Sequence, residues 1–169
     1  MNRIKVVNDI SELVPILRAV DTDVKRSVFT DVTQNWLTGK QVGEKYGEEG
    51  VEALRFFEKM KLVETKWQTG VNEKGQPAPE KAYHGFYGSF HINASSPIGE
   101  ISDVLAVATM TDSKYRSVED KLLKMVGDQG MFAGDVADEL KVTQTTLRAL
   151  VKRSGRLDFR GHRIIRFEE

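Results

Sequence analysis

The chain of 169 residues contains no cysteine. This absence excludes disulfides, thiolate metal sites and cysteine nucleophiles. The N-terminus carries Arg3 and Lys5 with no apolar stretch after them, so we expect no signal peptide. The longest apolar run, residues 104–110, is too short to cross a bilayer. We therefore predict a cytoplasmic protein with no membrane partner.

The sequence also lacks the patterns of common catalytic sites. It has no glycine-rich phosphate loop and no evident set of serine, histidine and aspartate, so we predict no enzyme and no cofactor. His84 and His91 lie seven residues apart on one expected strand and therefore on opposite faces, which argues against a shared metal ion. We predict no metal site.

Net charge is absent as well, because 25 basic side chains balance 25 acidic ones. The balance hides an asymmetry. Residues 141–167 contain eight basic side chains and one acid, Asp158; eight minus one leaves +7 there and −7 elsewhere. A local excess of this size indicates a polyanion partner for the C-terminal end.

Apolar residues at helical spacing predict helices over 10–20 and 24–32 in the N-terminal half. A capping-box pattern at Thr38 opens a short helix that Gly47 breaks, and a longer helix follows over 48–60. Two strands, from Val63 and over 82–92, then flank a polar tip at 70–80. This order predicts a winged helix-turn-helix over 1–96 with a long wing at 63–92.

The serine and proline at 96–97 predict the start of an apolar helix within 97–116. The remaining segment, 117–169, repeats the winged helix-turn-helix pattern in compressed form and ends in a short hairpin over 157–167. We therefore predict a mainly α fold with small β-hairpins, in the α+β class, with two winged helix-turn-helix units joined by an apolar helix.

The helix expected after Thr143 is the predicted recognition helix of the second unit. Such helices read base edges in the major groove, and basic wings contact phosphates or the minor groove. The alternative is a basic surface that binds nothing. We predict that double-stranded DNA is bound by Thr143, Gln144, Thr145, Arg148, Lys152, Arg153, Arg156, Arg160, His162 and Arg163.

The sequence of the first unit gives a weaker indication of DNA binding than that of the second unit. Its expected recognition helix begins with Glu48, Glu49 and Glu52, which repel phosphate. One alternative is that this unit docks weakly on DNA through basic residues before the helix and in the wing, namely Lys40, Lys45, Lys66, Lys74 and Lys81. The other is that it serves as a protein-interaction or effector module.

The apolar helix within 97–116 has two interpretations. It packs on its own N-terminal domain, or it joins two copies of the chain and so pairs two DNA-binding units. We favour a homodimer. The predicted dimerisation residues are Leu13, Leu17, Ile98, Ile101, Val104, Leu105 and Ala108.

The order of these segments resembles the ArsR-type winged-helix regulators over about the first 110 residues. The residues that carry the resemblance are 21–26, 38–42 and 62–64. The stretches 87–93 and 132–137 are similar to a two-domain archaeal branch of such proteins. The resemblance implies a dimeric regulator, although the metal-sensing cysteines of that family are missing here.

Three functions follow from these patterns. The first is a transcriptional regulator that binds duplex DNA as a dimer. The second is a protein-interaction adaptor in a transcription or nucleic-acid-processing complex, and the third is an RNA-binding winged helix. The sequence identifies neither an operator nor a small-molecule effector.

Overall fold

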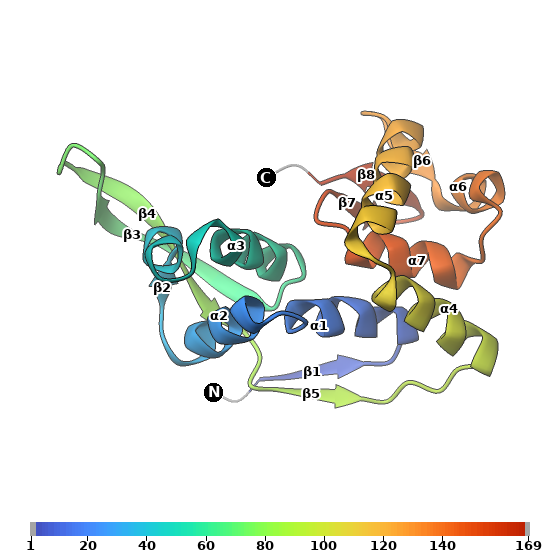
Figure 1. Cartoon of the computed structure of the whole chain (residues 1–169), viewed down its shortest axis with the longest axis horizontal. Helices are drawn as coiled ribbons and strands as arrows, with labels where there is room; N and C mark the ends of the chain where they lie inside the picture. Colours follow the sequence, from blue (N-terminus) through green and yellow to red (C-terminus); the bar gives the residue numbers. More distant parts are fainter. Residues whose placement is uncertain (1–2, 168–169) are drawn as a thin grey trace. The chain divides into compact units, whose positions relative to one another are not determined.

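The structure is a computed structural model that describes residues 3–167 (Figure 1). Its contacts divide the chain into two compact units. Within the described range, unit 1 consists of residues 3–6 and 19–91, and unit 2 of residues 7–18 and 92–167. The outermost ends of the predicted domains 1–96 and 117–169 lie outside the described residues.

Unit 1 contains α2 (Asp23–Gln34), β2 (Leu37–Thr38), α3 (Gly39–Lys59), β3 (Val63–Val71) and β4 (Pro77–Gly85). Its antiparallel sheet has the strand order β2-β4-β3. This order of helices and strands is that of a winged helix, as the sequence predicts. Two short strands that the sequence patterns do not separate, β1 (Ile4–Val7) and β5 (Ser89–Ile92), pair with each other.

Helix α3 is two helices joined at Gly47. The Thr38 hydroxyl accepts a hydrogen bond from the backbone N–H of Gln41 at 3.2 Å, and the Gln41 side chain accepts from the N–H of Thr38 at 2.9 Å. This capping box fixes the start of the first helix. Gly47 has φ 70° and ψ −163°, a conformation nearly restricted to glycine, and turns the chain into the second helix. The predicted helix-turn-helix is confirmed.

The paired strands of the first wing extend further toward its tip than predicted. Of residues 70–80, predicted as a long polar hairpin tip, only 72–76 lie outside the strands, and Val71 pairs with Pro77. The returning segment 82–92 is split between β4 and β5 rather than being one strand. Prolines are tolerated at the outer end of β4 because β2 pairs only with Tyr83 and Ala82, which leaves one side of that end without a neighbour.

Unit 2 contains the second winged helix together with N-terminal elements. Its described elements are η1 (Ile10–Glu12), most of α1 (Leu13–Ala19), α4 (Ile98–Thr109), α5 (Asp112–Val126), β6 (Met131–Phe132), α6 (Ala133–Leu140), α7 (Gln144–Arg153), β7 (Leu157–Arg160) and β8 (Arg163–Arg166). The sheet order β6-β8-β7 matches that of the first wing.

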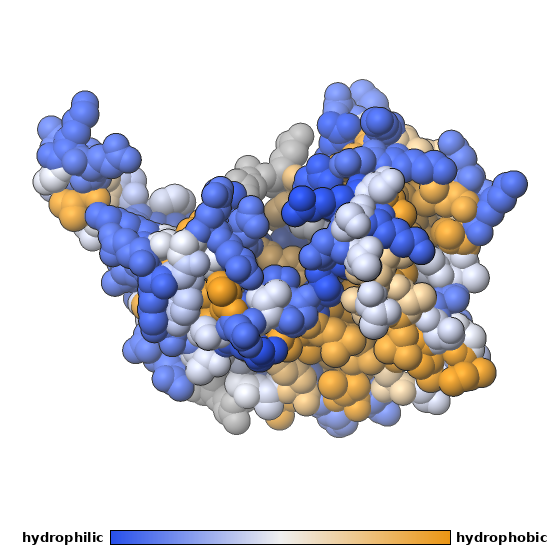
Figure 2. Space-filling model, viewed as in Figure 1, coloured by the Kyte–Doolittle hydropathy of each residue, from blue (hydrophilic) through white to orange (hydrophobic). Residues whose placement is uncertain are grey.

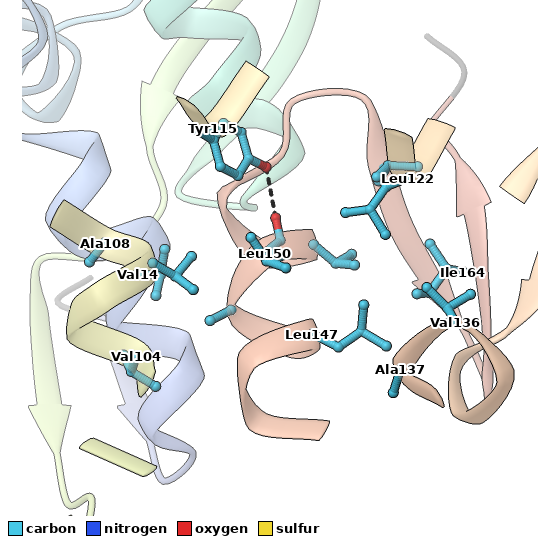
Figure 3. Packing of buried hydrophobic residues seen from close by; sticks show 14 of the residues in the cluster. Val14, Val104, Ala108, Tyr115, Leu122, Val136, Ala137, Leu147, Leu150 and Ile164 are labelled. Atoms are coloured by element: carbon cyan, nitrogen blue, oxygen red, sulfur yellow. Dashed lines mark hydrogen bonds between the residues drawn. The ribbon is translucent and has the colours of Figure 1, made fainter. Parts of the chain in front are cut away.

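Helix α7 is the centre of the unit 2 core (Figure 3). Its buried residues Leu147 and Leu150 lie between two groups of apolar side chains. One group comes from α1 and α4, and the other from α5, α6 and β8. The labelled members of these groups are Val14, Val104, Ala108, Tyr115, Leu122, Val136, Ala137 and Ile164.

This packing explains why the compact units differ from the predicted division at residues 96 and 116. The second winged helix is small and has little core of its own. Ile10, Val14 and Val107 pack into the same buried cluster as α7, so residues 7–18 and α4 belong with the second winged helix. Among residues 3–167, no helix combines the length and apolar character needed to span a membrane.

Candidate nucleic-acid interface

Helix α7 begins where the sequence predicts. The hydroxyl of Thr143 accepts a hydrogen bond from the backbone N–H of Thr146 at 3.0 Å and donates to Asp103 at 2.8 Å. The cap supplies a partner for one of the free N–H groups of the first turn. Thr143 therefore has a structural role at the helix start.

Two predicted DNA-binding residues of α7 are buried. Thr145 is 8 % exposed, and the side chain of Arg153 is 2 % exposed. The Arg153 guanidinium donates to the carbonyl oxygens of Val107 at 2.8 Å and Met110 at 2.7 Å, and to the carboxylate of Asp112 at 2.8 Å. Burial lowers the pKa of Arg153, and the negative charge of Asp112 acts in the opposite direction. Both side chains are buried in the core of unit 2, so the surface of α7 that is open to a partner does not include them.

Further arginines of the predicted site are paired with carboxylates. Arg148 donates to Asp9 at 2.8 Å. Arg156 donates to Glu119 at 2.6 Å and to Asp120 at 2.8 Å, and these two acids raise its pKa. Each acid lies more than 30 residues away in the sequence, so the count of charges over 141–167 could not include it.

Arg163 also forms hydrogen bonds inside unit 2, in this case with backbone carbonyls. It donates to the carbonyl oxygens of Gly130 at 2.7 Å and Gln129 at 3.3 Å. This holds the second wing against the turn before β6. Four predicted residues have side chains that form no hydrogen bond or ion pair with another residue of the range 3–167: Gln144, Lys152, Arg160 and His162. The Lys152 side chain is half-buried, and the other three are exposed.

The charge asymmetry of the sequence is therefore largely cancelled in the fold. Counted over whole units, basic residues exceed acidic ones by one in unit 1, and acidic residues exceed basic ones by one in unit 2. The basic C-terminal segment is folded together with the acids of 7–18 and 98–139. Net charge alone does not select unit 2 as the nucleic-acid surface.

The five lysines of unit 1 that the sequence analysis names differ in whether they pair with an acid in the described range. Lys45 pairs with Asp31 at 2.7 Å, and Lys81 pairs with Glu58. Lys40, Lys66 and Lys74 form no ion pair with any residue of the described range.

These three lysines lie on the elements of a winged helix that approach DNA. Lys40 is at the start of α3, Lys66 is in β3, and Lys74 is at the wing tip. Lys66 lies over the ring of Trp36 at 4.1 Å from its centroid, which orders its position at the base of the wing. The wing also exposes Trp67, which is 70 % accessible.

The second half of α3 presents acids, as the sequence predicts. Glu48 and Glu52 are exposed, and Glu49 accepts a hydrogen bond from the Thr22 hydroxyl at 3.0 Å. A carboxylate repels phosphate but accepts a hydrogen bond from the amino group of cytosine. The helix thus suits base contacts better than backbone contacts.

The predicted dimerisation residues fall into two groups. Val104 and Ala108 are buried in the core of unit 2, and Leu13 and Ile101 pack against it. These four residues therefore pack within their own chain, against the second winged helix and not on the N-terminal domain. Leu17, Ile98 and Leu105 are exposed at 46 %, 81 % and 51 %. Figure 2 shows apolar surface gathered over α4 and α1.

Among residues 3–167, no group of three or more histidine or acidic side chains is arranged to hold a metal ion. The sequence did not point to the carboxylates that neutralise the C-terminal arginines, namely Asp9, Asp112 and Glu119. No local signal identifies them, because they meet the arginines only through the tertiary fold.

Two helix-turn-helix elements, each with its own wing, define a class of nucleic-acid-binding regulatory proteins. The family model described as ArsR transcriptional regulator matches residues 7–168, and the chain belongs to this family. The match extends over both compact units. Family membership makes the chain a transcriptional regulator of a DNA-binding type. No curated protein matches the chain.

Proposed function

We propose that the protein regulates transcription by binding duplex DNA as a dimer, with the first winged helix as the main contact. The observation that carries this proposal is the contrast between the two units. Lys40, Lys66 and Lys74 form no ion pair within residues 3–167 and lie on the elements of unit 1 that approach DNA in a winged helix. In unit 2, α1 and α4 cover one face of α7, and Arg148 on its exposed face is paired with Asp9.

The first wing supplies the main electrostatic contact in this proposal. Lys66 and Lys74 neutralise phosphates on either side of the minor groove, and Lys40 contacts the backbone beside the major groove. Exposed neutral side chains of β3, such as Gln68 and Thr69, are able to hydrogen-bond base edges. Glu48 and Glu52 accept from cytosine and oppose other bases, which gives sequence preference at some cost in affinity.

From the sequence alone, the main contact is expected on α7 and the second wing. Lys152 and Arg160 remain available there for secondary phosphate contacts. Arg148 joins them only if it leaves Asp9. The internal pairing of the other arginines supports a lesser role for this surface.

The test is the salt dependence of binding to a mixed-sequence duplex of about 30 base pairs. Replacing Lys40, Lys66 and Lys74 with Gln makes the salt dependence weaker: the negative slope of log K against log salt decreases in magnitude by about 0.9 for each phosphate that is no longer neutralised. The matched control replaces Lys114, Lys121 and Lys124, which are exposed on α5, and leaves the slope unchanged.

Other outcomes decide between the alternatives. If replacing Lys152 and Arg160 lowers the affinity for DNA more than replacing the three lysines of unit 1 does, the main DNA contact lies in unit 2. Tighter binding to structured RNA would support the RNA-binding function. Absence of any nucleic-acid binding by the folded wild type would support the adaptor function.

The dimer rests on the exposed apolar residues Leu17, Ile98 and Leu105 of unit 2. Exposed apolar surface of this kind marks association sites. Replacing Ile98 and Leu105 with Asp should convert a dimer into the 19.1 kDa monomer in sedimentation velocity. Val71→Asp in the first wing, where the exposure of 58 % lies between those of Leu105 and Ile98, is the control and keeps the dimer. A monomeric wild type would contradict this part of the proposal.

A further inference from the structure

The outward side of α7 lines a cavity of about 370 Å³ within unit 2. Helix α7 contributes Gln144, Arg148 and Lys152 to its lining, and the segment around η1 contributes Asp9 and Glu12. The second wing and the start of α6 complete it. Cavities of roughly 300–1,000 Å³ are the size in which proteins bind small molecules.

The shape of this surface favours a small ligand over a duplex. A recognition helix must project in order to enter a major groove about 12 Å wide. Here the exposed stripe of α7 borders a hollow shared with η1 on one side and with Gly161 and His162 of the wing on the other. Such a hollow is the kind of surface that takes a small molecule, whereas base edges are read by side chains that project from a helix.

The charged groups of the cavity are balanced. Arg148 and Lys152 supply two positive charges, and Asp9 and Glu12 supply two negative charges. Only the Arg148–Asp9 pair is formed within the described residues, through Nη1 of the arginine at 2.8 Å. The Lys152 ammonium and the Glu12 carboxylate have no side-chain partner in residues 3–167, so one group of each sign is available to a ligand.

The lining also has an apolar part. Phe159 is half-buried in β7, and Ala133 is half-buried at the start of α6. A ligand with one positive group, one negative group and an apolar body would match every part of this lining. A phosphate monoester matches poorly, because its second negative charge would face Asp9 and Glu12.

We propose that this cavity is an effector site for a free α-amino acid with an apolar side chain. Lys152 and the remaining N–H groups of Arg148 bind the carboxylate, assisted by the amide of Gln144. Glu12 binds the ammonium group, and Phe159 contacts the side chain. The site lies in unit 2, so binding is measured without DNA and does not depend on the proposed DNA contact.

The experiment is an amide NMR titration of the full chain with the standard amino acids. Gly161 reports on the cavity, and Gly75, at the tip of the first wing, serves as the distant reference. We expect saturable shifts at Gly161 but not Gly75 for at least one apolar amino acid. We also expect its des-amino analogue, which lacks the ammonium group, to bind about tenfold more weakly.

Two variants assign the contacts. Lys152→Gln weakens both the amino acid and the des-amino analogue about tenfold, whereas Glu12→Gln weakens only the amino acid. Lys124→Gln and Glu100→Gln, exposed in the same unit, change neither affinity. Unchanged thermal unfolding shows that each variant is folded.

The proposal is overturned if no amino acid shifts Gly161. It is equally overturned if Glu12→Gln affects the two ligands alike, or if a DNA duplex shifts the cavity residues and amino acids do not. In the last case the hollow is a nucleic-acid surface after all. Failure of DNA binding in the lysine variants of unit 1 has no bearing on this result.

Discussion

At the scale of single residues, the arginines of unit 2 serve mainly as internal links. Arg153, Arg156 and Arg163 use carboxylates or backbone carbonyls of the same unit. A guanidinium group has five N–H donors in a fixed geometry and is well suited to such sites. Sequence composition counts these residues as surface charge, although their hydrogen-bonding capacity is partly used inside the protein.

Arg153 offers the clearest residue-level prediction. Arg153→Leu removes the donors that satisfy the carbonyls of Val107 and Met110 at the end of α4. We expect the free energy of unfolding to fall by about 2 kcal/mol. Urea denaturation measures the decrease. Arg160→Leu, an exposed position without a partner in the described range, should change stability by less than about 0.5 kcal/mol.

Asp9 gives a pH-dependent prediction. Burial alone would raise the pKa of this carboxyl, but hydrogen bonds from Ser11 and the charge of Arg148 outweigh burial and lower the pKa below its ordinary value. A lowered folded-state pKa stabilises the fold above the unfolded-state pKa, and the contribution disappears as pH falls through the folded-state pKa.

The measurement compares wild type and Asp9→Asn by urea denaturation at about pH 7 and about pH 3. Wild type should be the more stable protein at the higher pH, and the difference should shrink at the lower pH. A difference that is the same at both pH values would show that the Asp9 charge does not contribute.

At the scale of elements, local signals predicted most helices and both hairpins. Thr38 and Thr143 cap helices as expected, and Gly47 separates two helices as expected. The predictions differ from the structure at positions where contacts with residues distant in the sequence determine the local conformation. The outer strands of the first wing exist because β3 and β4 pair with each other through nine residues, despite Pro77 and Pro79.

Gly47 tests the turn between the two halves of α3. Its φ of 70° with ψ of −163° is strained for any residue with a Cβ. Gly47→Ala should destabilise the protein by about 1–3 kcal/mol in chemical denaturation. Gly39→Ala, at a helical position with no atom near the added Cβ, serves as the control and should change stability little. Equal destabilisation in both variants would contradict this explanation.

At the scale of the whole molecule, the sequence predicted the α+β class and two winged helices but not which segments form each unit. Grouping residues 7–18 with the C-terminal part depends on the packing of Val14 and Ile10 with α7. The periodicity of a helix gives its apolar face but not the partner of that face. The same limit explains why the predicted DNA surface on α7 contains two buried residues, Thr145 and Arg153.

The central claim is that the first winged helix, rather than α7 and the second wing, makes the main DNA contact. Site-specific photocrosslinking to a duplex tests it most directly. A benzophenone amino acid replaces Lys74 at the tip of the first wing or, in a separate variant, Arg160 at the end of β7. We predict a strong crosslink from position 74 and a weak one from position 160; the reverse pattern would contradict the claim.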